Sequence, residues 1–326
     1  MRSWLGFSDI IIQVNSPKIS IVSITTVGYR KGRPELSGSV STKWRPTEHT
    51  GLSLVLREDV TDKECTPLIP ALFAEMELSQ KGNIVAKASL SRNYRFPTLN
   101  DLYFLPGGNP DLRKESGWTY DAGISFATGK EGVYTLSGSA NWFDSHIKDW
   151  IIWLPTTKGF FSPDNIKDVH ASGIELRGDL NLILAKEWKV ELNGAFSWTP
   201  SINEGEPRTP ADQSVGKQLP YVPEYSSSIR GLVSWHSWSF LYKWCYYSER
   251  FTMSSNDISL TGKLPSYFMS NVTLEKRCSP AWADISLKAA INNLFNEEYL
   301  SVLSRPMPGI NFEFFIGITP KWGKYK

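Results

Sequence analysis

The residues best suited to metal binding or nucleophilic chemistry are scarce in this chain of 326 residues. Three cysteines, Cys65, Cys245 and Cys278, are an odd number without a CxxC spacing, which indicates plain thiols rather than a disulfide framework or a zinc site. No two of the histidines stand at ligand spacing in the sequence, so we expect no metal site and no cofactor. The four histidines are His49, His146, His170 and His236.

Sequence motifs of enzymes and of nucleic-acid-binding proteins are also absent. There is no GxSxG, HExxH or P-loop pattern, so we expect the protein not to be an enzyme. Lysine and arginine total 35 against 33 aspartates and glutamates, and the two signs are interspersed without a basic run. This balance does not favour a nucleic-acid partner.

Aromatic residues, in contrast, are abundant, with 13 Trp, 13 Tyr and 16 Phe. Four of them, Tyr94, Phe96, Tyr103 and Phe104, fall in one long connection between predicted strands. Rings in such a connection can stack on a planar or apolar ligand, so these four are the candidate ligand-binding residues. The alternative is that they pack the connection itself.

The elements that would position these residues are β-strands, because apolar and polar residues alternate along most of the chain. Between Glu187 and Trp198 the apolar face begins at Trp188 and ends at Trp198, as in strands whose ends meet the two membrane interfaces. About fourteen segments show this alternation, many of them about ten residues long. Charged residues on their other faces predict a hydrated wall with ion pairs or, alternatively, a substrate path: Glu175, Arg177, Asp179, Lys189, Glu191 and Lys288.

The lengths of the connections separate a membrane barrel from a soluble sandwich, which also alternates. Short connections near 45–49, 80–82, 128–131, 183–186, 236–237 and 276–281 alternate with long ones near 58–70, 95–116, 153–170, 200–223, 249–265 and 294–309. Short turns at one end and long loops at the other are typical of outer-membrane barrels. We therefore predict an all-β fold, an antiparallel transmembrane β-barrel with very little helix.

Two sequence boxes resemble those of a known family. The stretch Arg92–Tyr103 with the Asn-Pro-Asp-Leu box at 109–112, and the Asn-Leu-Phe-Asn sequence at 293–296 followed by Pro308-Gly309, are similar to boxes in TonB-dependent outer-membrane receptors. Three details differ: Arg113-Lys114 follows the first box, Ile310 follows Pro308-Gly309, and Ile318 is followed by further residues to Lys326. The positions that carry the resemblance are expected to be structural: Pro97, Leu99, Leu102, Asn109, Pro110, Asp111, Leu112, Asn293, Leu294, Phe295, Tyr299, Pro308 and Gly309.

The resemblance implies a location in the outer membrane of a Gram-negative bacterium and a barrel of 22 strands filled by an N-terminal plug. About fourteen strands fit here, so we expect residues 1–326 to be the C-terminal portion of such a barrel domain, without the plug, the partner motif or a signal peptide. Haem receptors of the family place a histidine between the stretch that corresponds to Arg92–Tyr103 and the Asn-Pro-Asp-Leu box. No histidine lies between Phe96 and Asp111 here, so haem uptake is not expected.

The resemblance also implies a function and its partners. The expected function is that of a receptor for a scarce nutrient such as a ferric siderophore or cobalamin, energy-coupled only in a full-length form. Its partners would be outer-membrane lipid, a small nutrient ligand and, through the N-terminal part, a TonB-type energy transducer. The alternative is a truncated, non-functional remnant or an ungated passive pore.

Overall fold

The computed structural model describes residues 7–23, 29–79, 83–185, 187–207 and 210–321. Residues 7–23 are described by their backbone alone. The terminal residues 322–326, which differ from the family's usual ending, lie outside the described residues. One short helix, α1 (Leu99–Tyr103), is present, and no helix in the described ranges is long and apolar enough to cross a bilayer. Nearly all other ordered structure is strand, as the alternation predicted.

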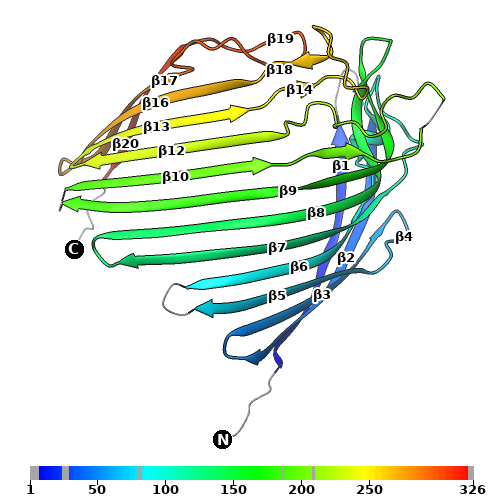
Figure 1. Cartoon of the computed structure of the whole chain (residues 1–326), viewed down its shortest axis with the longest axis horizontal. Coiled ribbons are helices and arrows are strands. Elements are labelled where there is room, and N and C mark those ends of the chain that lie inside the picture. Colours follow the sequence, from blue (N-terminus) through cyan, green and yellow to red (C-terminus); the bar gives the residue numbers. More distant parts are fainter. Residues whose placement is uncertain (1–6, 24–28, 80–82, 186, 208–209, 322–326) are drawn as a thin grey trace, which may run out of the picture.

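Fourteen strands follow one another in chain order across a single antiparallel sheet (Figure 1). They are β1 (Phe7–Ser23), β2 (Arg30–Thr47), β3 (Thr50–Thr61), β5 (Ile69–Ser79), β6 (Ile84–Arg95), β7 (Glu115–Lys130), β8 (Tyr134–Pro155), β9 (Phe161–Ala185), β10 (Trp188–Trp198), β12 (Tyr225–Trp235), β13 (Trp238–Tyr247), β16 (Tyr267–Cys278), β17 (Ala283–Asn292) and β20 (Asn311–Pro320). Six short strands lie in the connections: β4 (Glu64–Cys65), β11 (Ser201–Asn203), β14 (Arg250–Phe251), β15 (Lys263–Leu264), β18 (Leu300–Val302) and β19 (Arg305–Pro306). The predicted strand number is confirmed.

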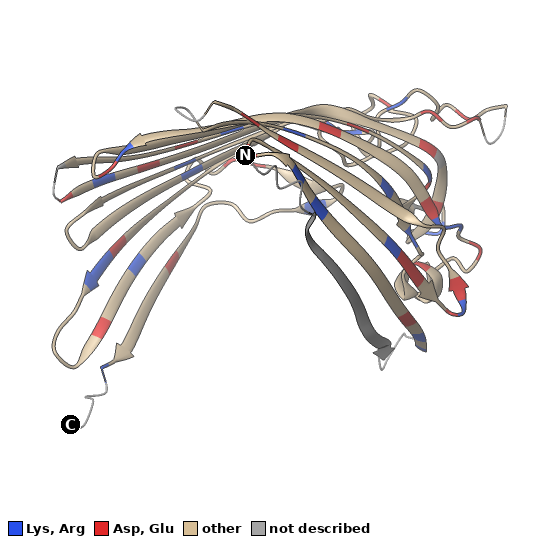
Figure 2. Ribbon diagram, turned by 90° about the horizontal axis from the view of Figure 1, so that it is seen from below, with Lys and Arg blue, Asp and Glu red and all other residues tan. Residues whose placement is uncertain are grey.

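The sheet curves into an open arch (Figure 2). In the described part of the chain, β1 pairs with β2 and β20 pairs with β17, so these two strands form the edges of the sheet. The barrel is therefore not closed within these residues.

The two faces of the sheet differ as the sequence predicted. On the apolar face, large side chains remain uncovered: Leu192 is 43% exposed, Phe196 38% and Phe240 46%. A soluble sandwich would bury this face against a second sheet. The opposite face carries the interspersed charges and lines hollows of about 630 and 460 Å³, as the concave side of an arch does.

Hydrophobic burial is concentrated at one end of the strands. Ile166, Val169 and Leu219 are nearly inaccessible and pack with Trp150, Ile152 and Val222. This small core joins the far ends of β8 and β9 to the connection that precedes β12. It stiffens the end of the sheet at which the long connections gather (Figure 1).

The short and long connections alternate between the two ends of the strands, with one correction. The long connection predicted near 153–170 is wrong in extent, because β8 and β9 remain paired up to Pro155 and Phe161 and leave only the turn 156–160. Asp149 interrupts the regular extended backbone with a φ of 56°, but pairing resumes between Trp150 and Ile166. This break in the apolar–polar alternation is why the sequence did not predict the extended β8–β9 hairpin. The small core around Ile166 and Val169 packs against that hairpin.

Candidate functional site

Of the four predicted ligand-binding rings, Tyr94 lies near the end of β6 and the other three lie in the connection beyond it, and the four make separate contacts. Tyr94 and Phe96 meet edge to face with ring centroids 5.5 Å apart, and the Lys114 ammonium lies 5.0 Å from the Phe96 centroid. Tyr103 lies 5.8 Å from the Tyr29 ring. The same ammonium pairs with the Glu64 carboxylate, so this cation–ring contact joins β4 to the connection after β6.

Phe104 contacts a different ring, because it ends helix α1 and turns toward β8. Its ring centroid is 5.8 Å from that of Trp153, and its side chain is 37% exposed. Tyr94 and Phe96 are therefore together, whereas Tyr103 and Phe104 each pack on a neighbouring segment. Ligand contact by these four residues stays a prediction.

Asp101 organises this loop region, although sequence reasoning did not single it out. The Thr98 hydroxyl accepts a hydrogen bond from the Asp101 N–H at 3.1 Å, and the Asp101 carboxylate accepts one from the Thr98 N–H at 2.8 Å. This reciprocal capping box starts α1. The other carboxylate oxygen accepts from the Trp153 indole N–H at 2.9 Å, so a residue that is only 5% exposed ties the helix to β8. The Thr-x-x-Asp spacing at 98–101 is the sequence pattern that predicts such a capping box.

The Asn-Pro-Asp-Leu box holds the connection against the end of β9. The Asn109 side chain accepts from the Asp111 N–H at 3.0 Å and donates to the Pro163 carbonyl at 3.2 Å. Pro110 and Asp111 are exposed, while Leu112 is partly buried. Pro97 and Leu99 of the preceding box are buried, and Leu102 is partly buried. The expected structural role of these positions stays a prediction.

The adjoining Arg113 links the box to β8. Its guanidinium donates to the Asp149 carboxylate at 2.7 Å, and this hydrogen bond raises the pKa of Arg113. The Asn165 side chain accepts from the Arg113 N–H and donates to the Asp149 carbonyl. A buried asparagine of β9 therefore bridges two segments at the base of the loop.

The second box closes the connection before β20 around a buried asparagine. Asn293 is 2% exposed, and its side chain donates to the Glu297 carbonyl at 2.9 Å and accepts from the Glu297 N–H at 2.8 Å. The Asn296 side chain accepts from the Ile310 N–H at 2.9 Å. A Cβ at Gly309 would lie 2.6 Å from that same Asn296 oxygen, so a larger residue there would displace this side chain.

Other positions of this box lie around the buried asparagine. The Leu294 N–H donates to the Ser270 carbonyl at 2.8 Å, and the Pro308 carbonyl accepts from the Asn293 side chain at 3.4 Å. Phe295 is 61% exposed, so it does not belong to the packed part. Tyr299 stacks on Tyr267 with ring centroids 4.8 Å apart.

A buried arginine beneath this aromatic pair is a second feature that the sequence did not reveal. Arg250 is 6% exposed, its guanidinium carbon lies 5.0 Å from the Tyr267 ring centroid, and one of its nitrogens donates to the Leu300 carbonyl at 3.0 Å. Loss of hydration on burial lowers the pKa of Arg250. The side chain connects the short β14–β15 and β18–β19 pairs to the sheet.

The concave wall carries the ion pairs that the charged faces predicted. Arg230 on β12 donates to Asn193 at 2.9 Å and reaches Glu191 at 3.3 Å, both on β10. Asn193 in turn donates to Asp179 on β9 at 2.6 Å. Farther along the sheet, Lys288 lies 4.0 Å from Glu275. The wall is thus polar and cross-linked between neighbouring strands.

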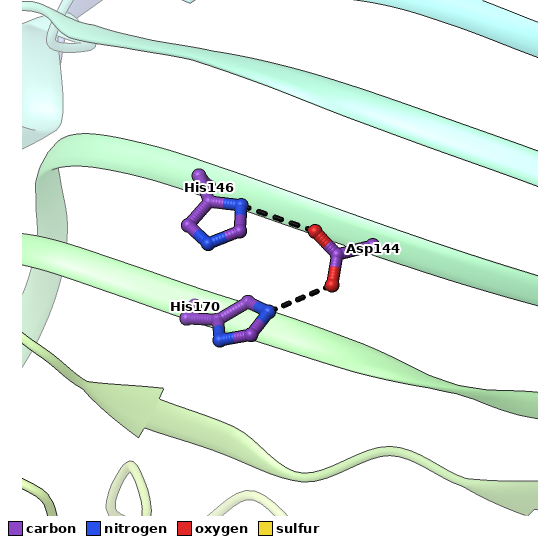
Figure 3. Close-up of side chains that lie close together, drawn as sticks. All are labelled: Asp144, His146 and His170. Carbon is purple, nitrogen blue, oxygen red and sulfur yellow. Dashed lines mark hydrogen bonds and ion pairs between the residues drawn. The ribbon is translucent and has the colours of Figure 1, made fainter.

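The histidines, which have no ligand spacing in the sequence, are brought together in one place. His146 on β8 lies directly opposite His170 on β9, and both approach the Asp144 carboxylate (Figure 3). The other two, His49 and His236, each pair with a single glutamate. Register between strands, which no sequence motif encodes, creates the histidine pair.

The family match and the curated relatives of this chain point to the same family. Residues 22–294 match the family model described as TonB dependent receptor-like, beta-barrel. The vitamin B12 transporter BtuB of Vibrio vulnificus is 24% identical over 243 residues, which cover 72% of this chain and 33% of that protein. BtuB of Photobacterium profundum is 30% identical over 109 residues, covering 31% of this chain and 17% of the relative. The chain thus spans about a third or less of the length of these curated relatives.

Solved structures share the fold. The copper transporter OprC aligns with a TM-score of 0.64 at 15% identity, over 89% of this chain and 48% of that one. A variant of the ferric enterobactin receptor PfeA from Pseudomonas aeruginosa aligns with a TM-score of 0.64 at 18% identity, over 90% of this chain and 46% of the other. Together with the family match over most of the sequence, the curved sheet and its alternating connections lead to one conclusion: the chain belongs to the TonB-dependent receptor family, in its β-barrel part.

Proposed function

We propose that the chain forms the C-terminal portion of the barrel wall of an outer-membrane receptor for a scarce small nutrient, of the cobalamin or ferric-siderophore class. One observation carries the proposal: the concave, polar, ion-paired face of the sheet ends on the side of the long connections, where the Tyr94–Phe96 ring pair lies. A polar wall keeps a hydrated path through lipid, and the rings offer faces on which a large planar or aromatic nutrient stacks. The matched relatives are named as vitamin B12, siderophore and copper receptors or transporters.

The membrane is the partner that the outer face fits. Exposed apolar side chains along the strands match hydrocarbon, and rings at the strand ends match the interfaces: Trp188 and Trp235 stack with centroids 5.6 Å apart at the short-turn end, and Lys276 lies 4.6 Å from the Trp238 ring. The matched region covers 33% of the Vibrio vulnificus BtuB sequence. We therefore propose energy coupling through a TonB-type transducer only for a longer protein that contains this chain.

An ungated passive pore or a non-functional remnant is the second candidate. The observation that favours it is the open arch, whose edge strands β1 and β20 do not pair with each other in the described residues. A polar wall without a gate would conduct small ions irrespective of any nutrient.

Equilibrium binding distinguishes the two. Outer membranes from a strain without its own cobalamin and siderophore receptors, carrying the chain as part of the longer receptor proposed above, are titrated with cyanocobalamin and with a ferric catecholate siderophore. We expect saturable binding of one ligand, weakened roughly tenfold when Tyr94→Ala and Phe96→Ala are combined, because two stacking faces are lost. Phe295→Ala, which removes an exposed ring from another long connection, is the matched control. Absence of binding to either ligand, with ligand-independent ion conductance, would favour the pore.

A further inference from the structure

Two imidazoles and a carboxylate converge on the outer face of β8 and β9. His146 Nδ1 lies 3.1 Å from one oxygen of Asp144, and His170 Nε2 lies 2.8 Å from the other (Figure 3). Asp144 and His146 are two residues apart on β8, which puts both on one face, and His170 is the cross-strand partner of His146. The ligand atoms of the three residues all lie within 4.8 Å of one another.

This spacing is close to what a small divalent ion requires. A tetrahedral ion with bonds of about 2.0–2.2 Å keeps neighbouring ligand atoms about 3.3–3.6 Å apart, so modest side-chain rotations would open the present contacts around it. Imidazole nitrogens combined with one carboxylate oxygen favour zinc, copper or nickel over magnesium and calcium, which prefer oxygen ligands alone. The donor set therefore selects a class of metal.

A fourth residue orients one of the imidazoles. His170 Nδ1, the nitrogen that faces away from Asp144, lies 3.0 Å from a carboxylate oxygen of Glu204, just after β11. A carboxylate that accepts a hydrogen bond from the outer nitrogen of an imidazole fixes the ring and strengthens it as a metal ligand. His170 therefore has both a carboxylate beside its proposed metal-binding nitrogen and a second carboxylate that orients its ring.

The cluster is accessible and separate from the concave wall. It occupies the same face of β8 as Trp142, toward the end with the long connections, and the His146 side chain is 56% exposed. Beside it is a hollow of about 470 Å³ whose lining includes Trp118, His146 and Glu204. An ion therefore has a path to the cluster from outside the barrel wall.

We propose that Asp144, His146 and His170 form a binding site for a late first-row divalent metal ion, with Zn²⁺ as its type, in which Glu204 orients His170. Three protein ligands leave at least one position for water. The ion would join β8 to β9, and through Glu204 to the segment after β11, on the lipid-facing side of the long-connection end. This role is independent of the nutrient path, which runs along the opposite face.

The first test is a zinc titration of the full chain in detergent, prepared metal-free and without a polyhistidine tag. We expect one high-affinity Zn²⁺ per chain by calorimetry, and an affinity lower by about a hundredfold or more in the double variant His146→Asn, His170→Asn. Glu204→Gln should weaken binding less, by on the order of tenfold, because it loses only the orienting hydrogen bond. His49→Asn and His236→Asn are matched controls, since within the described residues each of those imidazoles pairs with one glutamate and neither belongs to the metal-type cluster.

A second test uses Cu²⁺, because the number of imidazole nitrogens bound to copper can be measured separately from any loss of folding. With one equivalent of Cu²⁺, electron paramagnetic resonance should show coupling to two imidazole nitrogens in the wild type and to one in each single histidine variant, with unchanged circular dichroism throughout. Zinc binding of equal affinity in the double variant, or no stoichiometric binding to the folded wild type, would overturn the proposal and leave the cluster as a hydrogen-bonded surface group.

Discussion

At the scale of single residues, the polar positions of the two family boxes act by satisfying buried backbone groups. Asn293 is the clearest case, because its side chain both donates to and accepts from Glu297 while its own backbone has a φ of 52°. Asparagine tolerates this left-handed conformation better than most residues. Backbone geometry and hydrogen bonding therefore select the same amino acid.

Replacement of Asn293 by alanine should consequently destabilise the end of the sheet. The change leaves the Glu297 N–H and carbonyl without their partner in a buried setting, which costs about 1–3 kcal/mol for such a group, and adds the strain of the left-handed backbone. The measurement is the urea midpoint of the detergent-solubilised chain, followed by tryptophan fluorescence.

Asn83→Ala provides the control for Asn293. Asn83 has a similar φ of 42°, but it is exposed in the β5–β6 turn. We expect the free energy of unfolding to change by less in this variant than in the Asn293 variant. Equal losses in the two variants would attribute the effect to backbone strain alone and contradict the hydrogen-bonding argument.

At the scale of elements, the alternation of short turns and long connections gives the sheet two different ends. Two native thiols mark them: Cys65 in β4 lies among the long connections, and Cys278 ends β16 at a short turn. Both are exposed, whereas Cys245 is partly buried on the concave wall. If long connections face outward from the cell, the two exposed thiols lie on opposite sides of the outer membrane.

Thiol labelling of intact cells should therefore distinguish them. A membrane-impermeant maleimide should label Cys65 in a Cys245→Ser, Cys278→Ser variant, and should leave Cys278 unlabelled in a Cys65→Ser, Cys245→Ser variant. After the outer membrane is permeabilised, both variants should be labelled to a similar extent. Labelling of Cys278 alone in intact cells would invert the proposed orientation.

At the scale of the whole molecule, the open arch is the dominant feature. β1 and β20 each present one unpaired row of backbone donors and acceptors in the described residues. Lipid offers such groups no hydrogen bonds, so these edges must pair with each other, with another chain or with further polypeptide before the sheet is stable in a bilayer.

For residues 1–326 expressed by themselves behind a foreign signal peptide, we accordingly expect aggregation or ungated ion conductance, together with a strand-dominated circular dichroism spectrum in detergent. Planar-bilayer recording and sedimentation are the measurements. Nutrient uptake that depends on both the ligand and the proton-motive force would contradict this expectation, and a mainly helical spectrum would contradict the fold.

The strand number, the identity of the two faces and the ends with long connections were determined by the sequence itself. Strand periodicity is local: each residue's face depends only on whether its position is odd or even, so the face of Trp188, Leu192 and Phe196 follows without reference to any partner. Turn residues and box motifs are local in the same sense, and so is the Thr98–Asp101 spacing that forms the capping box.

Cross-strand proximity was decided only by the tertiary structure. His146 meets His170, and Trp153 meets Asp101, because register fixes which residues of separate strands and loops lie side by side. Register depends on every turn and irregularity between the two positions. The left-handed backbone of Asp149 is one such irregularity, and it breaks the alternation that would have predicted the β8–β9 hairpin. Pairing energies of many residues together set that register, so no short stretch of sequence contains it.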